Sequence, residues 1–432
     1  MTSHALALSL VLVIAQVQQP APPAVVLPDT PADCVKTVRD FAGKRQQQLR
    51  PPTGMTSEIL RQVERERIAI AKDCAAKFDV AAIAVSNLPA LADLYTEAGQ
   101  PDHAKVALDR ALAAKEMPAA DRAVVLAQAV RSGLREPKSP GRNARLEAYV
   151  DELDRLPESV FEQQFIAHNA LNNYYRADDI DEGIVKHSTW IIDASQTFTP
   201  EQRNRLSMNV ANAYANMAEA LAGQGLTEKA IDLLRRGQAE WKGVPRVDEG
   251  YLLPVIERLN LVGTVGTPIT APTWFNMPEG KTSLEMPGAV TLLEFTAHWC
   301  GPCKESYPGI KRLLAKYGPQ GFRVVFATEL YGYFGTEQRL SPEAEIERDR
   351  GYFVKAEGFD VPIAISARAE PELVNGRPFY APDKNLAAYK VGGIPQIHLL
   401  DKQGKIRLIM VGYDDANEPR LAKMIEDLLR EK

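Results

Sequence analysis

The 432-residue chain has only four cysteines, no excess of positive charge and, after its first residues, no long hydrophobic run. Its formal net charge of −5 gives a nucleic-acid-binding role no electrostatic support. No later stretch approaches the about 18 continuous apolar residues of a transmembrane helix, so we expect a soluble mature protein. With 45% hydrophobic and 25% charged residues, the chain can form two or three globular domains.

Two of the cysteines stand close together, in the sequence Trp299-Cys300-Gly301-Pro302-Cys303. Cysteines at this spacing meet on one face of the first turn of a helix, where their sulfurs can close a small, reversible disulfide. The apolar, β-prone run at residues 289–295 predicts a buried strand, and residues 306–317 carry apolar side chains at a helical period. A strand that ends in Cys-x-x-Cys and leads into a helix predicts a redox site.

Over residues 262–432 the sequence resembles the TlpA/ResA-like branch of the secreted thioredoxin-fold thiol-disulfide oxidoreductases. The likeness rests on several separated pieces. Residues 266–284 resemble the family's first hairpin, and Glu294 stands six residues before Cys300, where the family has a buried acid. Residues 389–396 resemble the family's cis-proline loop.

This resemblance implies an α/β thioredoxin-like fold for the C-terminal part of the chain. It also implies that a cis-proline loop packs over the disulfide and offers the backbone of Ile394 to the substrate peptide. An ordinary trans proline in a loop is the alternative for Pro395. The substrate-binding residues that the resemblance indicates are Trp299, Gly301, Pro302, Ile394 and Pro395.

The chemistry of the site follows from the expected position of each residue. At a helix N-terminus, unpaired backbone N–H groups and the helix dipole favour a thiolate, so we predict that Cys300 is the exposed, attacking nucleophile. Cys303, one turn further in and more buried, should resolve the mixed disulfide. Glu294 is the predicted proton acceptor, because a carboxyl in a buried strand is desolvated and takes up a proton near neutrality. A glutamate on an edge strand, facing water, is the alternative.

Some residues depart from the family pattern. Ser306 stands where ResA-like proteins carry a glutamate, so a second acid is absent or is replaced by Glu305. We expect His298 at the surface, and Gln396 stands where a small residue is common. A zinc site is the alternative to a redox site for the cysteine pair. Zinc usually needs four protein ligands, however, and the pair together with His298 offers only three. We therefore expect neither a metal nor another cofactor.

An insertion is expected after the strand at residues 323–327. It begins at residues 331–335 and runs for about 30 residues, which is longer than an ordinary connection. A local aromatic cluster packed on the domain is one interpretation, and a lid or partner surface is the other.

The N-terminus predicts export. Residues 1–15 have the short apolar run of a secretory signal peptide, and the polar, proline-rich residues 16–32 should be a flexible segment. The first residues lack lysine and arginine, so an uncleaved N-terminal membrane anchor is the alternative. Export favours a periplasmic or other extracytoplasmic location.

Residues 33–245 look helical throughout, with abundant alanine and small residues at the spacing of tetratricopeptide-like helical hairpins. The irregular spacing predicts an α-solenoid with degenerate repeats, followed by a linker at residues 246–261. Such solenoids often present a face that binds a protein ligand. A packed spacer or a dimerisation arm is the alternative.

Cys34 and Cys74 lie on either side of a break at residues 51–54. The two helical arms have similar lengths, so an antiparallel hairpin could bring the cysteines together. In an oxidising compartment this predicts a structural disulfide between Cys34 and Cys74, with two buried free thiols as the alternative.

Together these features predict an exported thiol-disulfide oxidoreductase that reduces protein disulfides through Cys300 and Cys303. A membrane thiol-transfer system is the expected source of electrons. The alternative is a protein-binding helical-repeat scaffold whose thioredoxin-like domain is catalytically idle.

Overall fold

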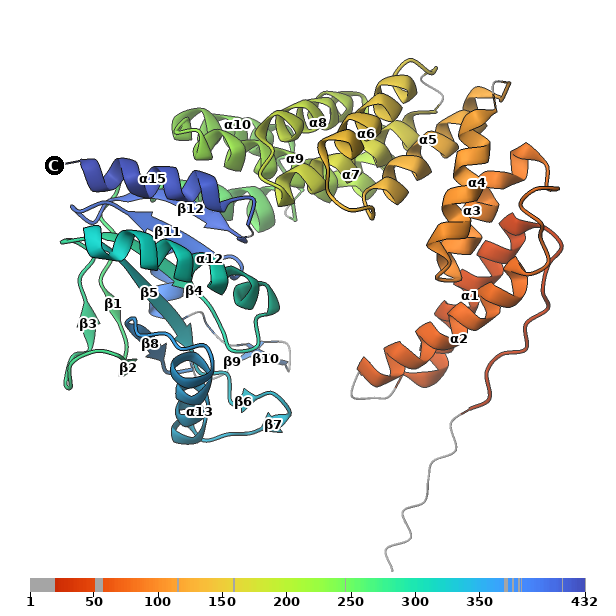
Figure 1. The fold of residues 1–432 in the computed structure, drawn as a ribbon. Helices are drawn as coiled ribbons and strands as arrows, with labels where there is room; N and C mark the ends of the chain where they lie inside the picture. Colours follow the sequence, from red (N-terminus) through yellow and green to blue (C-terminus); the bar gives the residue numbers. More distant parts are fainter. Residues whose placement is uncertain are drawn as a thin grey trace, which may run out of the picture. The chain divides into compact units, whose positions relative to one another are not determined.

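A computed structural model describes most of the chain (Figure 1). The signal-peptide prediction at residues 1–15 lies outside the described part. No helix in the described part is long and apolar enough to cross a membrane. The described residues are 20–50, 57–114, 116–157, 160–244, 246–368, 372–374, 377–379, 381, 383–413 and 415–431.

The chain divides into two compact units, residues 1–167 and 168–432. In the first unit consecutive helices pack in pairs, α1 with α2, α3 with α4 and α5 with α6, around a core rich in alanine and leucine. Small side chains in this core let the helix backbones approach closely. The tetratricopeptide-like character of these helices stays a prediction. The helices are α1 (Pro31–Leu49), α2 (Ser57–Ala75), α3 (Leu88–Glu97), α4 (Pro101–Ala113), α5 (Ala119–Gly133) and α6 (Pro140–Leu153).

Helices continue into the second unit, where α8 packs on α9, α9 on α10, and α10 on α11. The segment predicted as a linker, residues 246–261, folds here into a helical turn and α11, with Val255, Ile256 and Leu259 buried. It is therefore a packed part of the second unit instead of an open connection, although the domain boundaries themselves stay a prediction. The helices are α7 (Phe161–Ala177), within which the boundary between the units falls, α8 (Asp181–Ala194), α9 (Pro200–Gly223), α10 (Thr227–Glu240) and α11 (Leu253–Leu259).

A six-stranded sheet forms the centre of the rest of this unit, in the order β12-β11-β4-β5-β8-β2. Strands β4, β5 and β8 run parallel, whereas β11 is antiparallel to β4 and β12, and β2 is antiparallel to β8. The strands are β2 (Thr273–Phe275), β4 (Val290–Phe295), β5 (Phe322–Glu329), β8 (Ile363–Ser366), β11 (Gln396–Leu400) and β12 (Ile406–Val411).

Both faces of the sheet are covered, which explains the continuous apolar run of β4. Leu292 packs on one face with side chains of α12 (Gly301–Tyr317) and α15 (Glu418–Arg430), and Leu293 packs on the opposite face with Tyr389. The predicted strand at 289–295 and helix at 306–317 therefore agree with β4 and α12. The helix starts five residues earlier than its apolar period, because Cys300 caps it and Pro302 suits its first turn.

Short elements complete the unit. The insertion after β5 carries the hairpin of β6 and β7 and the helix α13. The remaining elements are β1 (Ile269–Thr270), β3 (Ser283–Leu284), β6 (Tyr333–Phe334), β7 (Glu337–Gln338), α13 (Pro342–Asp349), β9 (Glu372–Val374), β10 (Arg377–Phe379) and α14 (Lys384–Ala388).

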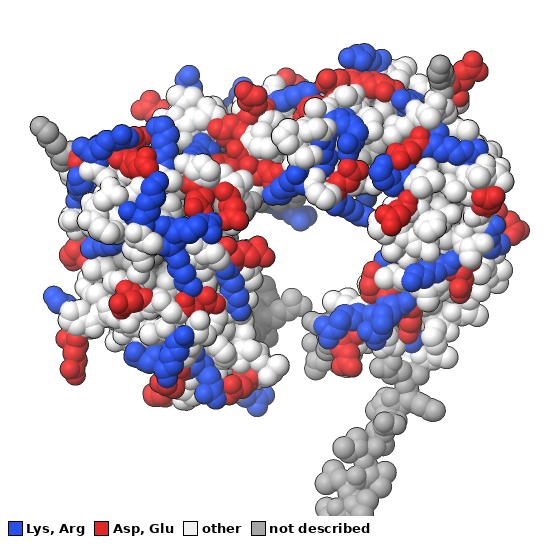
Figure 2. Space-filling model, in the orientation of Figure 1, with Lys and Arg blue, Asp and Glu red and all other residues white. Residues whose placement is uncertain are grey.

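Charges of both signs are interspersed over the face drawn in Figure 2. Many of them form ion pairs, such as Arg312 with Asp415 at 2.7 Å and Arg420 with Asp179 at 2.8 Å. The second of these pairs ties α15 to the turn between α7 and α8. An exposed pair such as Arg312–Asp415 stabilises a fold by about 0–1 kcal/mol.

Candidate redox site

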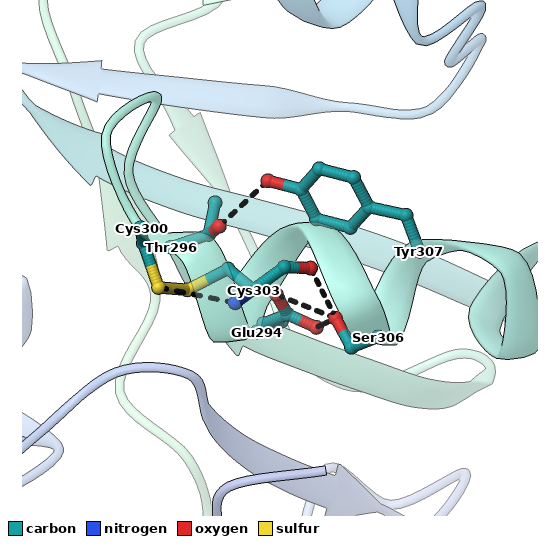
Figure 3. The surroundings of a disulfide bond; sticks show 6 residues. All are labelled: Glu294, Thr296, Cys300, Cys303, Ser306 and Tyr307. Carbon is teal, nitrogen blue, oxygen red and sulfur yellow. Dashed lines mark hydrogen bonds between the residues drawn. A yellow bond between two sulfur atoms is a disulfide. The ribbon is translucent and has the colours of Figure 1, made fainter. Parts of the chain in front are cut away.

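Cys300 and Cys303 are joined by a disulfide at the start of α12, with their Cα atoms 5.3 Å apart (Figure 3). Cys300 caps the helix, and its sulfur accepts a hydrogen bond from the backbone N–H of Cys303 at 3.1 Å. The sulfur thus lies at the positive end of the helix dipole, where negative charge is stabilised. This is the local geometry that the motif predicts.

The burial of Cys300 differs from the prediction. We expected an exposed sulfur, but Cys300 is only 2% exposed and Cys303 is fully buried. Cys300 belongs to the apolar cluster between the sheet and α12, against which Ile394 and Tyr331 also pack. The surface at the motif is instead formed by Trp299, which is 46% exposed, and by Gly301 and Pro302.

Glu294 lies in β4 beneath α12 and is fully buried, so the alternative of a water-facing carboxylate is wrong. The Ser306 hydroxyl lies 3.2 Å and 3.4 Å from its two carboxylate oxygens. Burial raises the pKa of Glu294 to about 8, although hydrogen bonds from Ser306 and Thr296 work in the opposite direction. The carboxyl can therefore exchange a proton near neutral pH.

Ser306 connects this acid to the disulfide. It is fully buried, and its hydroxyl donates a hydrogen bond to the backbone oxygen of Cys303 at 2.7 Å. Figure 3 shows Glu294 and Ser306 together below Cys303. The Thr296 hydroxyl lies 2.9 Å from the hydroxyl of Tyr307. Glu305, the suggested replacement for a second acid, is exposed instead. The site thus has one buried acid and a serine as its partner.

The loop before β11 contains a cis peptide bond between Ile394 and Pro395, so the alternative of a trans proline is wrong. Gln396 holds this loop in place. Its side-chain amide donates to the backbone oxygen of Tyr389 at 3.1 Å, and its carbonyl accepts from the N–H of Gly392 at 3.2 Å. The sequence marked Gln396 as a departure from the family, and these contacts give it a structural role.

The prediction of a surface position for His298 is wrong. His298 is 4% exposed, and its Nδ1 lies 3.1 Å from Oδ1 of Asp349 in the insertion. The rings of Tyr331, Tyr333 and Phe334 surround it, with centroids 5.8, 5.5 and 4.7 Å away. The sequence beside the motif could not reveal this burial, because the covering residues come from the insertion.

Cys34 and Cys74 are brought together in the core of the first unit, where both are buried free thiols. Burial raises the pKa of Cys34 to about 12, and interaction with Cys74 adds to this effect. The hairpin argument therefore placed them correctly, but the disulfide itself is not formed in this structure. Free buried thiols were the alternative, and a disulfide between them stays a prediction.

Part of the chain is similar to known proteins. No family model matches the chain. The chain is 27% identical over 125 residues to thiol-disulfide oxidoreductase ResA of Geobacillus thermodenitrificans (strain NG80-2), covering 29% of this chain and 56% of the relative. It is 30% identical over 69 residues to thioredoxin H7 of Arabidopsis thaliana, covering 16% and 54%. The chain thus spans about half the length of the curated relatives that it matches.

The chain is also similar to solved structures. A putative thiol:disulfide interchange protein DsbE from Chlorobium tepidum is 23% identical, with 39% of this chain and 97% of that chain covered, at a TM-score of 0.29. A second structure, StoA from Bacillus subtilis, is 21% identical, with 36% and 99% covered, at a TM-score of 0.23.

Proposed function

We propose that this chain, whose C-terminal part is a TlpA/ResA-like thioredoxin-fold domain, is a thiol-disulfide oxidoreductase that reduces protein disulfides. The observation that carries the proposal is the Cys300–Cys303 disulfide at the start of α12, with a buried acid beneath it. A helix N-terminus supports the attacking thiolate, and the raised pKa of Glu294 supports proton transfer near neutrality.

The reaction begins from the reduced dithiol. The Cys300 thiolate attacks one sulfur of the substrate disulfide, a mixed disulfide forms, and the other substrate sulfur leaves as a thiolate that takes a proton. Glu294 accepts the proton of the Cys303 thiol, and the Cys303 thiolate attacks the Cys300 sulfur. This releases the second substrate thiol and closes the Cys300–Cys303 disulfide. Two electrons have then passed to the substrate.

The substrate peptide is proposed to lie along the exposed side of the motif. Trp299, Gly301 and Pro302 supply the accessible surface there. Ile394 and Pro395 are proposed to complete the binding site, because Ile394 packs against the same apolar cluster as Cys300. The burial of Cys300 means that binding has to uncover its sulfur before the attack.

A separate dithiol reductant has to open the disulfide again after each cycle. We propose a membrane thiol-transfer system for this step and an extracytoplasmic location for the protein, since the N-terminal sequence resembles a signal peptide. The helical region is proposed to bind a protein ligand or to assemble the chain. The second candidate is a scaffold with an idle redox domain, which the low exposure of Cys300 favours.

Reduction of insulin by dithiothreitol tests the proposal. The wild-type chain should accelerate the reaction, the Cys300→Ser variant should not, and the Cys303→Ser variant should accumulate a mixed disulfide with the substrate. Glu305→Gln, a change at an exposed residue beside the motif, is the matched control and should behave like the wild type. Equal turnover by the wild type and Cys300→Ser would leave only the scaffold.

A further inference from the structure

A second group of polar side chains, which could bind a metal ion, lies next to the redox motif. His298 from the loop before α12 meets Glu345 and Asp349 from α13, and one ligand atom of each lies within 4.8 Å of the others. Glu345 and Asp349 are four residues apart, so they lie on one face of the helix. The three residues are each at least 96% buried, at 4%, 1% and 0% exposed.

The hydrogen bonding of this group is incomplete. Both carboxylate oxygens of Glu345 are hydrogen-bonded, because they accept hydrogen bonds from the backbone N–H groups of Tyr331 and Gly332 at 2.7 Å each. Within the described residues, neither carboxylate oxygen of Asp349 has a hydrogen-bond donor, and Nε2 of His298 has no partner. Nδ1 of His298 lies 3.1 Å from Oδ1 of Asp349, the distance of an ion pair if the histidine is protonated. Buried polar atoms left without partners destabilise a fold, so a ligand that pairs with them is favoured.

The group also contains more acidic side chains than basic ones. Two carboxyls share a buried space with one histidine, and burial raises the pKa of both Glu345 and Asp349. A divalent cation would compensate both carboxylates and leave the histidine neutral, the form in which imidazole binds metals.

We propose that His298, Glu345 and Asp349 form a zinc site. Imidazole and carboxylate are zinc ligands at about 2.0–2.2 Å, and three protein ligands leave a fourth position for water. Magnesium and calcium fit less well, because they prefer six or more oxygen ligands. This site is distinct from the cysteine pair, which cannot coordinate a metal while its disulfide is closed.

The ion would fasten the insertion to the redox loop. Its two carboxylate ligands come from α13, and its histidine ligand stands two residues before Cys300. The rings of Tyr331, Tyr333 and Phe334 would cover the histidine ligand. The hairpin of β6 and β7, which carries two of these rings and whose turn is exposed, is the natural path of entry.

Zinc binding to the full-length, oxidised chain tests the proposal. Competition against a chromophoric chelator should find one zinc per chain, and Asp349→Asn and His298→Gln should each weaken binding by at least about 10-fold. Glu343→Gln, at an exposed position of the same helix, should bind like the wild type. No zinc binding, or binding that both cluster variants leave unchanged, would overturn the site.

A second measurement covers variants that fail to fold. Crystals of the wild-type chain grown with zinc chloride should show an anomalous scattering peak between His298 and Asp349. A peak at Cys34 and Cys74 instead, or no peak at all, would contradict the proposal. Neither measurement uses disulfide exchange, so the zinc site and the proposed activity stand or fall separately.

Discussion

The Ser306 hydroxyl lies 3.2 Å from the nearer carboxylate oxygen of Glu294, in the fully buried space beneath the disulfide. The same hydroxyl donates to the backbone oxygen of Cys303 at 2.7 Å. The single proton of this hydroxyl is thus shared between two acceptors, the Glu294 carboxylate and the Cys303 backbone oxygen. The serine thus couples the protonation of the acid to the turn that carries Cys303.

Glu294→Gln should slow the resolving step. Because the pKa of Glu294 is raised to about 8, the wild-type carboxylate gains its ability to accept a proton as the pH rises through about 8. Release of the substrate from the mixed disulfide should therefore speed up over this range in the wild type. The variant should be about 100-fold slower at pH 8 and should lack this component. Rapid-quench kinetics of the mixed disulfide would measure it, and identical pH profiles for the two proteins would exclude the role.

Ser306→Ala should move the same pH profile. The hydrogen bond from Ser306 lowers the pKa of Glu294, so its loss should shift the midpoint above about 8. Removing a buried hydroxyl partner should also destabilise the fold by about 1 kcal/mol. The two effects are separable, since urea unfolding measures stability and the kinetic midpoint measures the acid. A midpoint that falls or stays in place would contradict the assigned contact.

The stability of the oxidised protein should fall with rising pH because of Glu294. Its pKa is about 8 in the folded chain and roughly 4.3 when unfolded, so between these values the folded state binds more protons. The stabilisation is complete below about pH 4 and is lost as the pH rises through about 8. Urea-unfolding curves from pH 5 to 9 should show this decline in the wild type and a flatter profile in Glu294→Gln. Parallel profiles would show that the acid does not titrate in this range.

Cys34 and Cys74 should resist alkylation in the folded, reduced protein. Both are fully buried, and burial raises the pKa of Cys34 to about 12, which suppresses its thiolate. Mass spectrometry should find Cys34 and Cys74 unlabelled in the folded protein and labelled after denaturation. If the denatured chain gains two labels only after reduction, Cys34 and Cys74 form the disulfide that the sequence predicts.

Local sequence patterns were sufficient to predict the parts of the site that are formed by residues close together in the chain. The apolar run around Glu294 predicted a buried strand, and the Cys-x-x-Cys spacing predicted paired sulfurs at a helix start. The burial of His298 and Cys300 could not be predicted in this way, because side chains from distant segments cover both. The role of Gln396 could not be predicted for a different reason. Its partners Tyr389 and Gly392 lie in its own loop, but the contacts depend on how that loop folds.

A redox titration of Cys300 and Cys303 tests the central claim most directly. The full-length chain would be equilibrated with mixtures of oxidised and reduced dithiothreitol or glutathione, and the closed disulfide quantified by alkylation and mass spectrometry. We predict one reversible two-electron transition on the reducing side, near the about −270 mV of thioredoxin and far from the about −120 mV of a strong oxidant such as DsbA. A cysteine pair that fails to interconvert would contradict the account.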